Sequence, residues 1–377
     1  MRPSARRSGP TPERWGRVLT TAALLLVLTG CSTSSYYLQA VRGHLDIVSR
    51  QRPIPKVLAD PATPPDVRER LQLVLELRTF AAQQLDLPVD GHYRRYADLQ
   101  RRFVVWNVNG APEFSLKATT WWYPFVGRLK YRGFFSEPMA QRLATRMAQE
   151  GQDVYVGGVE AYSTLGWFKD PVLNTFLHHT PEDLAEILFH ELAHQRLFIR
   201  GDTDFNEAFA TAVAEEATRR WLESTGQAEP LSRYRATQQR EAEFVTAVQA
   251  AREQLRLLYQ RHPVVPKAGA TPELLTALRE EKRLILENLR SEHARLRAAW
   301  GGNSPYAAWF DRPLNNAQLN TVATYFDLVP GFRRVLRSVD GNLPRFYEQV
   351  RQLGKLPKAE RRSRLADPSW PISGPLP

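Results

Sequence analysis

The segment His190-Glu191-Leu192-Ala193-His194 constrains the fold more strongly than any other part of this 377-residue chain. On an α-helix, two histidines four residues apart lie on one face, a turn from each other. The residues upstream predict such a helix, because Thr180 is a favourable N-cap, Pro181 suits the first helical position and Asp183 lies in the first turn. The two imidazoles can therefore bind one zinc ion from a single helix face.

Glu191 directly follows the first of these histidines. A carboxylate in this position can accept the proton of a water molecule that attacks a carbonyl group, and can then deliver that proton to the departing amine. Glu191 is therefore the candidate catalytic residue. The pattern indicates hydrolytic chemistry at a metal, with one zinc ion per chain.

A catalytic zinc ion needs a third protein ligand and an open fourth position. The only cysteine, Cys31, lies near the N-terminus, so the third ligand is expected to be a carboxylate or another histidine. A second helix is predicted after the turn at residues 201–204, and Glu207 lies in its first turns. Glu207 is the preferred third ligand, and Glu215 and Asp204 are the alternatives.

The segment 190–194, followed by Asn206-Glu207, resembles the gluzincin metallopeptidases, whose third ligand is the glutamate of an Asn-Glu pair on the next helix. The resemblance implies that His190, His194 and Glu207 hold zinc and that Glu191 acts as base and acid. Residues 161–168 and 201–210, together with the segment at 190–195, resemble a bacterial family of lipoproteins described as putative aminopeptidases. This similarity extends over most of the mature chain.

The sequence departs from the gluzincin pattern in two places. Only twelve residues separate His194 from Glu207, which requires a compact turn. Thr211 stands where gluzincins commonly carry an aspartate that supports a histidine ligand. Asp202, Asp204 and Glu215 are the candidates to replace that aspartate.

The N-terminal residues resemble the leader of a bacterial lipoprotein. Several arginines precede an apolar run at residues 18–28, which is too short for a membrane span. The run ends in Leu28-Thr29-Gly30-Cys31, which is similar to the lipobox that precedes an acylated cysteine. Cys31 is therefore the expected lipidation site. Ser32 follows, rather than the aspartate that commonly retains lipoproteins in the inner membrane, so we expect an outer-membrane protein that faces the periplasm.

The composition is that of a globular protein, with 43% hydrophobic and 24% charged residues. The formal net charge is +11, and the leader contributes five arginines and one glutamate to it. No basic-aromatic module of the nucleic-acid-binding type is present, so nucleic acid is not an expected partner. The expected partners are a peptide or protein substrate and the membrane that holds the lipid.

The pattern of hydrophobic residues predicts an α+β fold with a small sheet before the active-site helix and a large helical portion after it. The resemblance to gluzincins implies that the catalytic core is zincin-like. Two long helical segments, at about 231–261 and 271–300, predict an antiparallel helical hairpin. The expected parts of the chain are a signal peptide at 1–30, a membrane-proximal helical segment at 31–100, the catalytic core at 101–225, a helical region at 226–355 and a flexible tail at 356–377.

The residues that would bind substrate are less defined by the sequence. An oxyanion needs a nearby donor, and Tyr162 and Tyr325 are favoured over Tyr155 for this role. Glu160 is either a ligand for a peptide α-ammonium or a solvent-facing strand residue. We therefore expect a zinc aminopeptidase. The alternatives are an endopeptidase of envelope quality control and a non-catalytic lipoprotein that uses the helical hairpin as an interaction platform.

Overall fold

The computed structural model describes residues 34–124, 126–162, 169–262 and 271–370. The chain divides into two compact units, residues 1–49 and residues 50–377. In the first unit, the described part is one α-helix over residues 34–49. The leader and Cys31 lie outside the described residues. No helix in the described part is both long and apolar enough to span a membrane.

The second unit has an α+β fold that is mostly helical with small sheets, as the sequence predicts. Its strands are β1 (Arg52–Pro53), β2 (Arg95–Ala97), β3 (Val105–Pro112), β4 (Trp121–Tyr123), β5 (Gly127–Leu129), β6 (Tyr131–Phe134), β7 (Gln152–Val159) and β8 (Val172–Leu173). Its helices are α2 (Ile54–Ala59), α3 (Pro65–Gln84), α4 (Glu137–Gln149), α5 (Asn174–Leu177), α6 (Pro181–Arg196), α7 (Thr203–Thr225), α8 (Ala228–Arg261), α9 (Pro272–Ala299), α10 (Ala307–Phe310), α11 (Asn316–Phe326), α12 (Val329–Ser338), α13 (Leu343–Lys355) and α14 (Lys358–Ala366).

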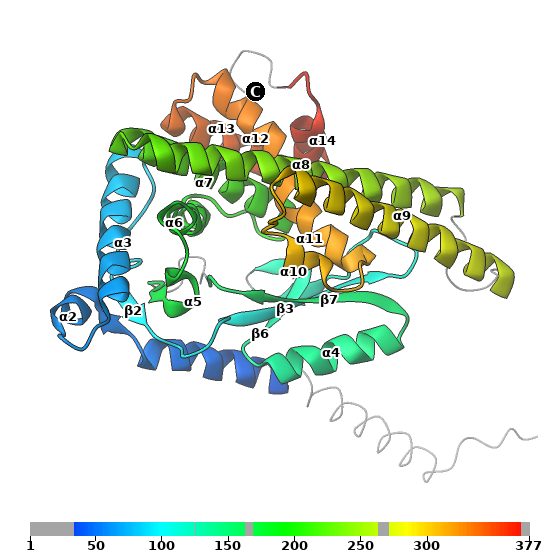
Figure 1. Ribbon diagram of the computed structural model, residues 1–377, viewed down its shortest axis with the longest axis horizontal. Helices are drawn as coiled ribbons and strands as arrows, with labels where there is room; N and C mark the ends of the chain where they lie inside the picture. Colours follow the sequence, from blue (N-terminus) through cyan, green and yellow to red (C-terminus); the bar gives the residue numbers. More distant parts are fainter. Residues whose placement is uncertain (1–33, 125, 163–168, 263–270, 371–377) are drawn as a thin grey trace, which may run out of the picture. The chain divides into compact units, whose positions relative to one another are not determined.

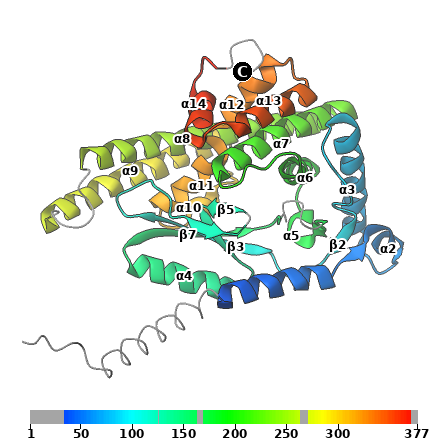
Figure 2. The same cartoon turned by 180° about the vertical axis from the view of Figure 1, so that it is seen from behind.

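The largest pairing of strands joins β6, β3 and β7 in that order, and both pairings are antiparallel. Helix α4 packs against this sheet on one face, and α11 packs against it on the other (Figures 1 and 2). Gly110 in β3 permits the close approach of α4, because a Cβ atom there would lie 2.2 Å from Cε of Met147. The sheet therefore forms the middle layer between two helical layers. Short pairings join β1 to β2 antiparallel, β2 to β8 parallel, and β4 to β5 antiparallel.

Helices α6 and α7 form the centre of the helical layer and pack closely against each other. Much of α7 is buried, including Phe205, Phe209 and a series of alanines. The ring of Phe205 contacts Phe332 of α12 at a centroid distance of 5.0 Å, and Phe189 of α6 contacts Phe80 of α3 at 6.2 Å. A helix that is apolar on nearly all sides must be covered on all sides. This packing holds α6 and α7 in one fixed relation.

The two long helical segments predicted from the sequence are α8 and α9, and they lie side by side in both ribbon views. Phe244, Val248 and Leu255 of α8 belong to the same buried cluster as Leu286 and Leu289 of α9. The existence of both helices confirms the periodicity of the sequence in this region. The antiparallel hairpin and the zincin-like character of the core stay predictions.

The flexible tail predicted at residues 356–377 is wrong for its first part. Residues Lys358–Ala366 form α14, which packs against α12. The proline and arginine content indicated a loose segment, but the buried side chain of Arg361 pairs with Asp202 at 2.7 Å. Such a pairing between distant residues leaves no trace in the local sequence. Residues 371–377 lie outside the described part.

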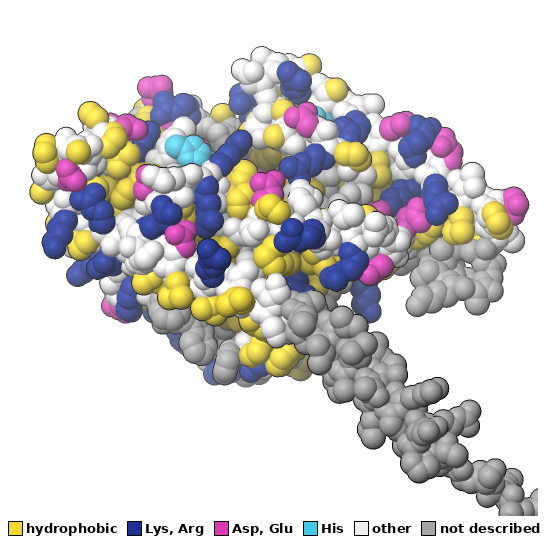
Figure 3. Space-filling view, turned by 90° about the horizontal axis from the view of Figure 1, so that it is seen from below, with side chains coloured by type: hydrophobic (Ala, Val, Ile, Leu, Met, Phe, Trp, Pro, Cys, Tyr) yellow, Lys and Arg dark blue, Asp and Glu magenta, His cyan; other side chains and the backbone are white. Residues whose placement is uncertain are grey.

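Charged side chains of both signs are mixed on one face of the molecule. On the face shown in Figure 3, Lys and Arg side chains are scattered among acidic and hydrophobic ones. This face therefore carries charges of both signs.

Candidate metal centre

Helix α6 places the two histidines of the 190–194 segment on one face. Thr180 caps the helix, because its side-chain oxygen accepts a hydrogen bond from the backbone N–H of Asp183 at 3.2 Å, as the sequence predicts. The rings of His190 and His194 lie 4.9 Å apart, centroid to centroid, and are nearly perpendicular, at 84°. Both Nε2 atoms face the same carboxylate on the neighbouring helix.

That carboxylate is Glu207, in the second turn of α7. Its Oε2 atom lies 3.3 Å from Nε2 of His190 and 3.6 Å from Nε2 of His194. One ligand atom from each of the three residues lies within 4.8 Å of the other two. The structure thus brings together His190, His194 and Glu207, which the sequence proposed as a set. The side chains are 18%, 7% and 13% exposed, so the cluster is sheltered but not sealed from solvent.

The compact turn between α6 and α7 is held by Asn206, a contribution that the sequence analysis missed. The Oδ1 atom of Asn206 accepts a hydrogen bond from the N–H of Ile199 at 2.7 Å, and its Nδ2 donates to the carbonyl of Ile199 at 2.8 Å. Gly201 occupies the left-handed region in this turn, with φ +75°. Since Asn206 directly precedes Glu207, these two hydrogen bonds, here called the Asn206 clamp, fix the position of the Glu207 side chain. The adjacent Asn206-Glu207 pair was the sequence signal that could have identified this role of Asn206.

The electrostatics of the cluster favour a carboxylate that stays ionised. Burial acts to raise the pKa of Glu207, but His194 and His190 outweigh it and hold the pKa well below its usual value. Burial acts to lower the pKa of His194, and the charge of Glu207 outweighs it and raises that pKa. Burial raises the pKa of Glu191, and the two imidazoles oppose this shift. Strong mutual perturbation of this kind is typical of functional sites.

The donor set fits a zinc ion. Tetrahedral zinc with bonds of about 2.0–2.1 Å keeps its ligand atoms roughly 3.3 Å apart, close to the 3.3 Å and 3.6 Å that separate the imidazole nitrogens from the carboxylate oxygen. Two imidazoles and one carboxylate are also a set used at catalytic zinc sites that keep a position open. The cluster therefore has the composition and spacing of a three-ligand metal centre.

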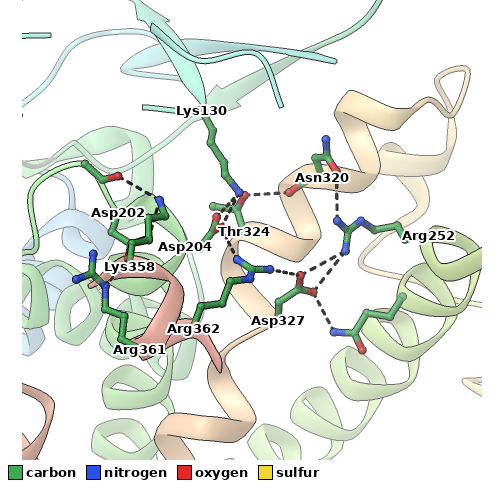
Figure 4. A network of polar contacts seen from close by, with 12 residues as sticks. Lys130, Asp202, Asp204, Arg252, Asn320, Thr324, Asp327, Lys358, Arg361 and Arg362 are labelled. Atoms are coloured by element: carbon green, nitrogen blue, oxygen red, sulfur yellow. Dashed lines mark hydrogen bonds and ion pairs between the residues drawn. The ribbon is translucent and has the colours of Figure 1, made fainter. Parts of the chain in front are cut away.

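The other acids considered for this centre are engaged elsewhere. Asp202 pairs with Lys358 at 3.0 Å and with Arg361, and Asp204 pairs with Lys130 at 2.5 Å and Arg362 at 2.9 Å (Figure 4). These contacts tie the start of α7 to α14 and to the segment between β5 and β6. Both aspartates therefore bind basic side chains, and neither is placed to act as the third metal ligand.

Glu215 is also paired, with Arg333 of α12 at 2.7 Å. Thr211, where an aspartate would support a histidine ligand in gluzincins, is buried. The buried Nδ1 atom of His194 has no hydrogen-bond partner among the residues that the structure describes. The supporting carboxylate expected from Asp202, Asp204 or Glu215 is therefore not seen in the described part of the chain.

Tyr325 lies beside the centre. Its ring is 6.2 Å from that of His190, centroid to centroid, and its side chain is 38% exposed. The negative charge of Glu207 raises the pKa of Tyr325 well above the usual value, which keeps the hydroxyl protonated and able to donate. Tyr325 sits on α11, whose N-cap Asn315 accepts from the N–H of Gln318 at 3.0 Å and donates to the carbonyl of Val154 at 3.0 Å. The sheet and the cap thus position the tyrosine.

The other two tyrosines have different neighbours. Tyr162 packs edge-on against Phe135 at a centroid distance of 5.4 Å. Tyr155 lies under the guanidinium of Arg312, whose carbon is 5.8 Å from the ring centroid, and burial raises the pKa of Tyr155. A role of Tyr162 in substrate binding stays a prediction.

A second group of ligand-type side chains joins Glu160 to two histidines before α6. Oε2 of Glu160 lies 2.6 Å from Nε2 of His179, and Oε1 lies 4.0 Å from Nε2 of His178. The hydrogen bond that His179 donates to the Glu160 carboxylate raises the pKa of His179. Burial acts to raise the pKa of Glu160, but the bond to His179 outweighs it and lowers that pKa. Glu160 is thus half-buried and paired, which neither interpretation of the sequence anticipated.

Comparison with known proteins places the chain in a family. The model of a family described as "Putative aminopeptidase" matches residues 35–365, which include both histidines, Glu191, Glu207 and Tyr325. No curated protein and no solved structure matches the chain.

Proposed function

Because the chain belongs to the putative aminopeptidase family, we propose that it is a zinc-dependent peptidase whose metal is held by His190, His194 and Glu207. The observation that carries the proposal is the convergence of these three side chains from α6 and α7, with contacts of 3.3 Å and 3.6 Å between nitrogen and oxygen atoms. The proposal includes a zincin-like core built around these two helices. It also includes an antiparallel arrangement of α8 and α9.

Zinc bound at this centre would supply Lewis-acid chemistry and favour ionisation of water. Glu191 lies on α6 directly after His190, and its carboxylate is close enough to the centre for the charges of both histidines and Glu207 to act on its pKa. We assign it two proton transfers: it accepts the proton of the water that attacks the substrate carbonyl, and it delivers that proton to the departing amine as the peptide bond breaks. The proton count balances without any other acid.

Tyr325 is the best-placed donor for the negative charge that develops on the carbonyl oxygen. Its protonated hydroxyl and its position beside His190 support this role. Tyr162 follows β7, where an extended substrate can add to the strand through backbone hydrogen bonds. We assign it a substrate-binding role.

We further propose that the chain is a lipoprotein acylated at Cys31 and held in the outer membrane, facing the periplasm. The support is the sequence Leu28-Thr29-Gly30-Cys31-Ser32, with its basic and apolar leader. The family description favours removal of N-terminal residues over internal cleavage. An endopeptidase would use the same metal and the same base.

The test is metal content measured by mass spectrometry, together with peptide hydrolysis, on four proteins: wild type, Glu207→Ala, Glu191→Gln and Glu223→Ala. Glu223 is the matched control, because it is an exposed glutamate on the same helix as Glu207. We expect about one zinc ion per chain in all but Glu207→Ala. Hydrolysis should be lost in Glu207→Ala and Glu191→Gln and retained in Glu223→Ala.

Peptides with free and with blocked N-termini complete the test. Cleavage of free-amine peptides alone supports an aminopeptidase, and equal cleavage of both forms indicates an endopeptidase. A wild-type protein without zinc and without hydrolysis would overturn the proposal and leave an interaction platform as the better account of α8 and α9.

A further inference from the structure

The helix of residues 34–49 exposes an unusual amount of hydrophobic surface. Five of the nine exposed large hydrophobic side chains of the described chain lie on it, so it stands apart from the remaining surface. They are Tyr37 at 41%, Leu38 at 69%, Val41 at 57%, Leu45 at 59% and Val48 at 45% exposed. Isolated exposed leucines are normal on a protein surface, but a contiguous set indicates a binding surface.

These five side chains form an apolar stripe along one face of the helix. The spacing from residue 37 to 41, 45 and 48 follows the helical period, and the five positions span roughly 100° around the axis. The stripe is therefore a continuous apolar face of this helix.

No carboxylate lies on the apolar stripe of this helix. Asp46 is the only acidic residue among residues 34–49, and its position on the helical wheel lies outside the stripe. Arg42 borders the stripe, and Arg50 and Arg52 follow the helix. A basic edge beside an apolar face is the pattern of helices that lie in the interface of an anionic membrane.

The chain upstream indicates what covers this face. The described part of the helix begins at residue 34, three residues after Cys31. An extended chain spans about 3.3–3.6 Å per residue, so residue 34 lies within about 11 Å of the proposed acyl site. The headgroup region on each side of a bilayer is only about 5–8 Å thick. A lipid on Cys31 therefore brings the helix to the membrane surface.

We propose that the apolar stripe inserts into the lipid surface and holds the helix in the plane of the membrane. This inference rests on the proposed acylation of Cys31. The acyl group supplies attachment, and the apolar stripe supplies orientation, because one linkage at the chain end leaves the helix free to rotate. An apolar face of this kind enters the bilayer by roughly 5–10 Å.

The experiment uses the full chain, processed in a bacterial host and reconstituted into vesicles of phosphatidylglycerol and phosphatidylcholine. Single cysteines carry an environment-sensitive fluorophore at Leu38, Val41 or Leu45 on the stripe, and at Ser35 or Asp46 off it. Exposed leucines far from the stripe in sequence, Leu257 and Leu284, are the matched controls, each 47% exposed. Lipids with a quencher in the acyl chain report depth. Thermal unfolding checks that each labelled protein is folded.

We expect quenching about twofold stronger, or more, at the stripe positions than at the others, because only an inserted face lies at the depth of the acyl chains. Equal quenching at all helix positions, or no quenching, in an acylated chain would overturn the insertion of the stripe but not the acylation of Cys31. Stripe labels that are shielded only at high protein concentration, without lipid quenching, would overturn it in favour of a second copy of the chain. If the protein without an added cysteine took up the fluorophore, Cys31 would carry a free thiol. That result would overturn both the acylation of Cys31 and the inference that rests on it.

Discussion

The turn between α6 and α7 depends on a single buried side chain, and replacing it tests how the metal centre is held. Asn206 is 2% exposed and makes two hydrogen bonds to Ile199, at 2.7 Å and 2.8 Å. The substitution Asn206→Ala deletes both bonds. The N–H and the carbonyl of Ile199 then lose their hydrogen-bond partner, and the smaller alanine side chain causes no steric clash in the turn.

The expected magnitude follows from these contacts. Each hydrogen bond contributes about 1 kcal/mol net, and a buried backbone group left without a partner costs about 1–3 kcal/mol. Ile199 is half-buried, so water compensates in part. We expect the free energy of unfolding to fall by about 2–4 kcal/mol. Since Glu207 follows directly, we also expect zinc affinity to fall about 10–100-fold, as when the partner of a metal ligand is removed.

The assay is urea unfolding of the zinc-free protein, followed by tryptophan fluorescence, with zinc affinity measured separately by competition with a chromophoric chelator. Asn288→Ala is the control, because Asn288 is exposed on α9, and its effect should stay within about 0.5 kcal/mol. If Asn206→Ala matched the control in both measurements, the clamp would not hold the turn, and the argument from its two hydrogen bonds would be refuted.

Three further predictions concern pairings that the fold creates. Glu160→Gln should lower the pKa of His179, as measured by NMR titration. In the wild type, the pKa of His179 is raised in the folded state, so the pair stabilises the fold at pH values below the pKa of an unfolded histidine. This stabilisation is lost as the pH rises through the pKa of His179 in the folded protein. Arg361→Ala should destabilise the fold by about 3–5 kcal/mol in urea unfolding, because it leaves Asp202 buried without its main partner. Gly331→Ala should cost about 1–3 kcal/mol by the same measurement, since a Cβ atom there would meet the backbone of α14 at 2.4 Å.

Controls for these predictions lie in the same chain. Arg351→Ala removes an exposed pair with Glu348 and should change stability by less than about 1 kcal/mol. A loss as large as that of Arg361→Ala would show that burial is not the deciding factor. An unchanged His179 titration in Glu160→Gln would contradict the ion pair. A fully stable Gly331→Ala would mean that α14 does not pack as closely as observed.

Several features were predictable because they depend on neighbours in the sequence. The capped start of α6 follows from Thr180 and Pro181, and the common face of His190 and His194 follows from the helical period. The long helices α8 and α9 and the strands before α6 were also evident from hydrophobic spacing. Local preferences decide such elements, so one sequence is enough.

The tertiary structure decided which distant residues meet. The sequence left Glu207, Asp204 and Glu215 as candidate third ligands, and only the crossing of α6 and α7 directs Glu207 to the histidines. The same crossing turns Asp204 toward Lys130 and Arg362. Three carboxylates on one helix differ by their rotation about its axis, and the burial of the apolar residues of α7 sets that rotation.

The same reason explains the predictions that failed. The segment after Leu356 looked loose because its arginines had no visible partners, yet Asp202 and Asp204 neutralise them across more than 150 positions of sequence. Glu160 looked exposed, yet it pairs with His179. The sequence by itself determined helices α6, α8 and α9 and the common face of His190 and His194. The folded chain alone decided the partners, because burial in the core fixes side-chain directions that no local pattern specifies.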